Sequence, residues 1–112
     1  MNEHDRIDRW LADLESTLRE AAALVERGID VYRADAALPL AFEALVNRVG
    51  DLAKRLSRAD AERFADPMWA SAARTRDFVV HHYDRIDPAL LWRTVTESFP
   101  RLRRLVDAAK RG

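Results

Sequence analysis

Residues 74–88 read RTRDFVVHHYDRIDP and hold the side chains of this chain that are best suited to chemistry. They include Arg76, His81, the adjacent His82 and Tyr83. A histidine titrates near neutral pH and can take or give a proton. An arginine can stabilise the charge that builds on a phosphate in a transition state. Without a metal, these two residue types suffice to cleave RNA by means of its own 2′-hydroxyl, which leaves a cyclic phosphate.

Other chemistries fit the sequence less well. His81 and His82 are neighbours, whereas metal ligands on a helix are usually three or four residues apart. None of the serines stands in a nucleophile motif, and three glycines are too few for a phosphate-binding loop. The sequence therefore predicts no metal and no other cofactor.

A structural interpretation of the same residues is also open. In it, Arg76 pairs with an acidic side chain, and the two histidines only cap the end of a helix. Residue types alone favour this interpretation over catalysis, because charged and polar residues at helix ends are common in solvated proteins.

The composition is typical of one helical domain, which we expect to span residues 1–112. Hydrophobic residues make up 48% and charged residues 34% of the chain, and no cysteine is present. The first residues lack the apolar core of a signal peptide, and no apolar run is long enough to cross a membrane. We therefore expect a cytoplasmic protein.

Charge is distributed unevenly along the chain, although the formal net charge is zero. Residues 1–66 carry 10 Lys or Arg against 14 Asp or Glu, and residues 67–112 carry 9 against 5. The second half is therefore the better place for an anionic partner, and residues 74–88 lie in it.

Hydrophobic periodicity predicts an all-α fold, an up-down bundle of four main helices. Asp66-Pro67 and Asp87-Pro88 have the chemistry of helix starts, so the third helix should run from about 67 to 82 and the fourth from 88. Apolar residues recur every three or four positions in the other helices. The first stripe is Ile7, Trp10, Leu11, Leu14, Leu18, Ala21 and Val25, the second is Leu38, Phe42, Leu45, Val49, Leu52 and Leu56, and the last is Leu91, Val95, Phe99, Leu102 and Val106.

Three further positions have expected structural roles. Residues 28–35 should connect the first two helices, with Asp35 capping the second. Gly50 lies off the second stripe and would let a neighbouring helix approach closely. Pro100 is expected to kink the fourth helix.

The 100° turn between successive helical residues places the reactive side chains around the third helix. Arg76 and Tyr83 share a stripe with Val80, which the sequence predicts to be buried. Phe78 points to the opposite side, so the helix is apolar on two faces, as in a central helix or one at a dimer interface. His81 lies about 140° from Arg76. Unwinding of the helix near residue 81, or a twofold axis between two chains, could bring them together.

The spacing of Arg76, His81 and Tyr83 resembles the Arg-x4-His-x-Tyr motif of the HepT toxins, which belong to the HEPN superfamily of small all-helical ribonucleases. The likeness extends to three longer segments. The family's second helix resembles FEALVNRVGDLAKRLS, its central block resembles PMWASAARTRDFVVHHYDRIDPALLWRTV with a tryptophan seven residues before the arginine, and its closing helix resembles FPRLRRLV. The resemblance as a whole covers roughly residues 36–106.

This resemblance implies a homodimer in which paired motif helices line a cleft for RNA. Arg76 and His81 would be the catalytic residues of a metal-independent endoribonuclease. Asp77 would fill the supporting polar position after the arginine, where the family often has asparagine. Tyr83 would be the tyrosine that a partner antitoxin, a minimal nucleotidyltransferase, modifies with AMP. His82 occupies a variable position and is given no role.

The resemblance leaves two functions from different classes. The first is the toxin of a type VII-like toxin–antitoxin pair, which the intact Arg76, His81 and Tyr83 favour. The second is a non-catalytic companion that binds substrate for the nucleotidyltransferase. A third and plainer alternative is a helical dimer whose only task is assembly.

Overall fold

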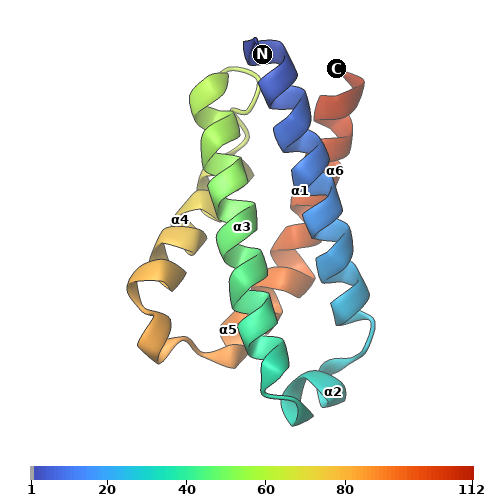
Figure 1. Cartoon of the computed structure of the whole chain (residues 1–112), viewed down its shortest axis with the longest axis vertical. Helices are drawn as coiled ribbons and strands as arrows, with labels where there is room; N and C mark the ends of the chain where they lie inside the picture. Colours follow the sequence, from blue (N-terminus) through green and yellow to red (C-terminus); the bar gives the residue numbers. More distant parts are fainter. Residues whose placement is uncertain (1) are drawn as a thin grey trace.

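The structure, a computed structural model, describes residues 2–112, and every regular element in that range is helical. α5, η2 and α6 follow one another without a break, so the chain has four long helical segments that run alternately up and down (Figure 1). This arrangement confirms the predicted all-α bundle. The elements are α1 (Glu3–Val25), α2 (Ile29–Ala34), α3 (Ala37–Ala59), α4 (Pro67–His81), the 3₁₀ turn η1 (Tyr83–Arg85), α5 (Pro88–Arg93), the π-helical turn η2 (Thr94–Ser98) and α6 (Phe99–Arg111).

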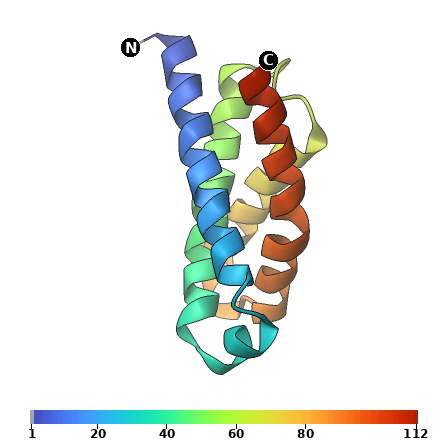
Figure 2. The ribbon, with the colours of Figure 1, turned by 90° about the vertical axis from the view of Figure 1, so that its right-hand side faces the viewer.

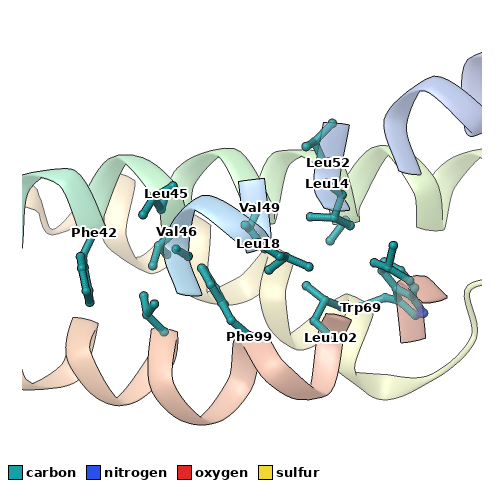
Figure 3. Close-up of a cluster of buried hydrophobic side chains, with 14 of the residues drawn as sticks. Leu14, Leu18, Phe42, Leu45, Val46, Val49, Leu52, Trp69, Phe99 and Leu102 are labelled. Atoms are coloured by element: carbon teal, nitrogen blue, oxygen red, sulfur yellow. The ribbon is translucent and has the colours of Figure 1, made fainter. Parts of the chain in front are cut away.

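The apolar stripes that the sequence predicts meet along the axis of the bundle (Figure 3). Every residue of the second and last stripes is buried, and in the first stripe only Trp10 and Val25 remain partly exposed. Figure 2 shows α6 beside α1, with the two chain ends at the same end of the bundle. Among residues 2–112, no helix has the length and apolarity to cross a membrane.

Aspartate side chains start three of the helices. The Asp66 carboxylate accepts a hydrogen bond from the Met68 amide and the Asp87 carboxylate one from the Ala89 amide, each at 2.9 Å. Asp35 accepts from the Ala37 amide at the same distance. All three caps agree with the sequence, because a carboxylate satisfies amides that lack a partner in the first helical turn.

The segment between α1 and α3 differs from expectation. Residues 28–35 are not a plain connection, because they contain the six-residue helix α2, which lies across one end of the bundle (Figure 2). Gly28 permits the sharp entry with its φ of +94°, a conformation that side chains disfavour. Tyr32 of α2 is buried and donates a 2.6 Å hydrogen bond to the Pro88 carbonyl. The start of α5 is thereby joined to α2.

Pro100, the expected kink, follows the π-helical turn η2. Proline has no amide hydrogen and clashes with the carbonyl four residues earlier. In η2 the Phe99 amide donates to the Thr94 carbonyl, five residues earlier, so the turn is wider than an α-helical one. Val95 and Phe99 nevertheless stay buried on either side of this turn.

Candidate functional site

Helix α4 carries Arg76 and His81, whereas Tyr83 lies just beyond it in η1. The α-helical conformation ends at His81, and His82 leaves it with φ −127° and ψ 30°. Because Arg76 and His81 both stand in regular helix, their directions differ by about 140°. The unwinding near residue 81 that could have brought them together in one chain begins only after His81.

Arg76 lies at a close crossing of α4 over α3, opposite Gly50. Its stem covers Gly50, and a Cβ atom added to Gly50 would contact the Arg76 Cβ and come within 2.7 Å of the Ala72 carbonyl oxygen. That separation is too short for real atoms, so only glycine fits at this position of α3. The predicted role of Gly50 in close approach is confirmed, and the neighbour it admits is the motif arginine.

The Arg76 guanidinium is held by polar side chains on one side. Its Nε donates to the Asn47 Oδ1 at 2.9 Å, and its Nη1 donates to the Asp77 Oδ1 at 3.2 Å. Lys54 Nζ lies 4.0 Å from the other Asp77 oxygen. The two positive charges of Arg76 and Lys54 therefore exceed the single negative charge of Asp77. The Arg76 side chain remains 29% exposed, so its guanidinium can still meet an anion from solvent.

His81 is exposed, and its ring is oriented by its own helix. Its Nδ1 lies 2.6 Å from the Asp77 carbonyl oxygen. A carbonyl can only accept a hydrogen bond, so this contact requires the proton on Nδ1. In the neutral ring, Nε2 is then the unprotonated nitrogen. It faces away from the bonded carbonyl and can serve as a general base.

His82 has a similar contact but a different neighbour. Its Nδ1 lies 2.9 Å from the Phe78 carbonyl oxygen, and its ring stacks on the Phe78 ring with centroids 4.3 Å apart. The sequence analysis missed this pair, although four-residue spacing on a helix would have indicated it. The stack keeps the His82 ring against the outside of α4.

The buried side of α4 agrees with the sequence at Trp69, which is buried, but differs from it farther along the helix. Val80 is 41% exposed and Tyr83 is 74% exposed, whereas Val79 is buried at 2%. From Trp69, the side of α4 that faces α3 continues through Ala72 and Arg76, which are partly exposed, to Val79. Tyr83 lies outside the helical stripe since the helix ends before it, and its phenol is open to solvent.

An apolar surface between α3 and α4 is left uncovered. Val80 on α4 is 41% exposed and Leu40 on α3 is 68% exposed, whereas Phe78 is exposed on the opposite side of α4, stacked on His82. A hollow of about 270 Å³ lies between α3 and α4, lined by Leu40, Glu43, Ala44, Asn47, Val79 and Val80. Figure 1 shows α4 at the edge of the bundle, so it is not the central helix that one interpretation of its two apolar faces suggested.

Metal-binding side chains are not clustered within the range that the structure describes. Among residues 2–112, no three His, Asp or Glu side chains come together as a group that could hold a metal ion. The carboxylates nearest the histidines have other contacts: Asp77 lies beside Arg76 and Lys54, Asp84 lies 3.8 Å from Arg85, and Asp87 caps α5.

Known proteins resemble this chain over most of its length. A family model described as "HepT-like: Ribonuclease HepT-like" matches residues 14–109. A protein of Caldanaerobacter subterraneus subsp. tengcongensis, named "Putative RNase TTE0752", is 27% identical over 97 residues, which cover 83% of this chain and 87% of that protein. No solved structure matches.

Proposed function

The chain belongs to the HepT-like ribonuclease family, and from that premise we propose that it is a toxin that cleaves RNA with Arg76 and His81. The observation that carries the proposal is the state of the two side chains on α4. Arg76 is held with part of its guanidinium exposed, and His81 presents a free Nε2. A phosphate-binding cation and a proton acceptor are the two groups that metal-independent RNA cleavage requires.

In the proposed reaction, His81 Nε2 takes the proton of a ribose 2′-hydroxyl. The 2′-oxygen bonds to the adjacent phosphorus, and the bond from phosphorus to the 5′-oxygen breaks. The 5′-oxygen takes a proton from a protonated imidazole or from water, so the products are a 2′,3′-cyclic phosphate and a 5′-hydroxyl. Arg76 stabilises the negative charge on the phosphorus oxygens, and Asp77 keeps the guanidinium oriented. Each of the two main roles contributes roughly two to four orders of magnitude in rate.

We propose that a homodimer completes the site. The two side chains point in directions about 140° apart on one helix, so a single phosphate is better reached by Arg76 and His81 from different chains. The uncovered side chains Val80 and Leu40, which line the hollow between α3 and α4, support this arrangement, because an apolar surface of this kind is stabilised by burial. A twofold axis beside α4 would cover it and bring two copies of the motif together.

We further propose that Tyr83 is the site of control by a partner nucleotidyltransferase in a type VII-like pair. Its phenol is 74% exposed and follows the catalytic helix directly, which supports access by another enzyme. The phenolic oxygen would attack the α-phosphate of ATP, losing its proton as pyrophosphate leaves, and Tyr83 would then carry AMP. A nucleotide beside His81 would block RNA by bulk and by negative charge. Both proteins would meet in the cytoplasm.

Expression of the protein alone tests the proposal. We expect it to slow growth and degrade cellular RNA, and we expect His81→Ala to abolish both effects. Co-expression with the nucleotidyltransferase should add one or more AMP groups to wild-type protein but not to Tyr83→Phe. If the wild type is harmless and leaves RNA intact, the alternative of a non-catalytic companion of the nucleotidyltransferase takes the place of the ribonuclease.

A further inference from the structure

A second pocket lies at the end of the bundle where α4 has its C-terminus. This α2–α5 pocket has a volume of about 600 Å³, within the usual range for ligand sites, and it lies between α2 and the start of α5. None of the motif residues lines it. Its walls include Tyr32, Arg33, Pro39, Pro88, Trp92 and Arg93.

The floor of this pocket is held by aromatic packing. Tyr32 is buried, and its ring centroid lies 4.7 Å from that of Phe42 and 5.0 Å from that of Trp92. Trp92 also stacks on Phe42 at an interplanar angle of 8°. The hydrogen bond from the Tyr32 hydroxyl to the Pro88 carbonyl joins the two walls. The pocket is therefore preformed, and its lining includes the half-buried Trp92.

The charged side chains of the α2–α5 pocket favour an anion. Arg33 and Arg93 are exposed and, within residues 2–112, neither guanidinium has a hydrogen bond or an ion pair with a carboxylate. The one acid in the lining, Asp87, uses an oxygen to cap the Ala89 amide. Two free guanidiniums beside an apolar, aromatic wall suit a flat ring that carries a phosphate. That description fits a nucleotide unit.

The pocket adjoins the motif along the chain. Asp87 follows Tyr83 by four positions, so the two Cα atoms are at most about 14 Å apart. Figure 1 shows the end of α4, α5 and α2 at the same end of the bundle. A single RNA strand that meets Arg76 and His81 can therefore continue toward this pocket.

We propose that the α2–α5 pocket is an RNA subsite, which binds a nucleotide of the substrate strand beyond the one that is cut. Arg33 and Arg93 bind its phosphate, and the apolar wall near Trp92 accepts its base. The proposal rests on the proposed ribonuclease function. It predicts a preference for RNA strands that are long enough to occupy both the Arg76 and His81 site and the α2–α5 pocket.

Binding of single-stranded RNA to a cleavage-deficient protein tests the subsite. In a His81→Ala background, we expect Arg33→Ala/Arg93→Ala to weaken binding of a fluorescent RNA by about 10- to 100-fold at low salt. The slope of log affinity against log salt should fall by about 0.7, because the contact to one phosphate of a single strand is lost. The matched control is Arg9→Ala/Arg111→Ala, which removes the same charge near the chain ends, at the opposite end of the bundle.

Cleavage by the otherwise wild-type protein gives a second measurement. Arg33→Ala/Arg93→Ala should raise KM for a long RNA and leave cleavage of a dinucleotide unchanged, because the dinucleotide does not reach the pocket. Equal RNA affinity in the pocket variant and the control variant would overturn the subsite. The ribonuclease function would still stand if the wild-type protein cleaves RNA. If free AMP instead binds in a manner that needs Arg33 and Arg93 and RNA affinity is unaffected, the pocket takes a mononucleotide and the RNA subsite is wrong. Absence of RNA cleavage by wild-type protein would instead remove the ribonuclease itself, and the subsite with it.

Discussion

Arg76 and His81 stand five residues apart on one helix, yet different parts of the molecule hold their side chains. Arg76 lies against α3, where Gly50 admits its stem and Asn47 accepts a hydrogen bond from its guanidinium. His81 is exposed, and its ring contact is to a carbonyl of its own helix. Tertiary packing therefore positions the arginine, whereas local helix geometry positions the histidine.

This difference indicates how the site is completed. Arg76 is held within one chain, because its hydrogen bonds go to Asn47 on α3 and to Asp77 on α4. Its side chain remains 29% exposed, so a phosphate can reach it. The segment from His81 to Asp87 is exposed except at Ile86, which packs against the core, and the hydrogen bond from Tyr32 to Pro88 lies just beyond it. A second chain, RNA or a modifying enzyme can approach it without displacing core residues.

Among changes to the arginine and to the residues that hold it, removing the Arg76 guanidinium should have the largest effect. We expect Arg76→Ala to lower the rate of RNA cleavage by about 10²- to 10³-fold, because the charge on the transition state loses its partner. Arg76→Lys should recover only part of the rate, since lysine keeps the charge but not the planar fork. Single-turnover cleavage of labelled RNA measures both rates. An unchanged rate in Arg76→Ala would remove the arginine from the mechanism.

The next largest effect is expected from a side chain added at Gly50, where α3 and α4 cross. Gly50→Ala places a methyl group against Arg76 and the Ala72 carbonyl, and such overpacking costs about 1–3 kcal/mol, partly offset by the better helix propensity of alanine, about 1 kcal/mol. We expect a lower free energy of unfolding and slower cleavage, because Arg76 must move. Chemical denaturation and RNA cleavage measure these effects.

Gly28→Ala is the matched control for that change. Nothing lies within 4 Å of a Cβ at Gly28, but its φ of +94° strains any side chain. It should therefore lower stability without changing cleavage by the folded protein. If Gly50→Ala behaves in the same way, the crossing does not position Arg76 for cleavage.

Removal of the hydrogen bond between Tyr32 and Pro88, at the far end of the exposed segment, should have a smaller effect. We expect Tyr32→Phe to lower the free energy of unfolding by about 1 kcal/mol, since it removes the bond to the Pro88 carbonyl. Burial, and secondarily the Asp87 carboxylate, raise the pKa of Tyr32 above its ordinary value.

The raised pKa sets the pH dependence of that difference. A folded state that keeps its phenol protonated more strongly than the unfolded state loses stability as pH rises above about 10. The advantage of wild type over Tyr32→Phe should therefore be full below pH 10 and shrink above it. Thermal unfolding of the two proteins from pH 8 to 11 tests this. A gap that widens with pH would contradict it.

The smallest effect should come from Asn47. Asn47→Ala removes one hydrogen bond from the guanidinium, while Asp77 and the packing over Gly50 remain. We expect a loss of a few-fold in cleavage rate, about 1 kcal/mol or less, with stability nearly unchanged because both groups are partly exposed. Asn47→Asp should keep the contact and serve as the control. A loss as large as that of Arg76→Ala would mean that Asn47 has a further role.

Much of the fold could be predicted from the sequence because it is written in local patterns. The stripes of α1, α3 and the last helical segment, and the aspartate caps at residues 35, 66 and 87, are found in the structure. Helix α2 was missed since six residues hold too few turns to show a period. The phase of α4 was wrong for a different reason. The sequence does not say which side of α4 the crossing helix occupies, so Val80 was expected inside and Val79 is found there.

For the candidate site, the sequence proposes residues but does not give their geometry. The motif spacing indicates Arg76, His81 and Tyr83. The contacts of Gly50 and Asn47 with Arg76 join residues almost thirty positions apart, and the spacing does not indicate them. The free Nε2 of His81 follows from a hydrogen bond that no spacing rule specifies. Tyr83 was placed on the wrong face because the helix ends two residues earlier.

Analysis of the RNA products in the presence of a chelator tests the central claim most directly. With excess EDTA, purified wild-type protein should convert RNA to fragments that end in a 2′,3′-cyclic phosphate. His81→Ala should lose this activity by about 10²- to 10⁴-fold, and its neighbour variant His82→Ala should keep it. Retained cleavage in His81→Ala, or fragments that require a metal ion, would contradict the assignment of His81 and Arg76 as a metal-independent ribonuclease site.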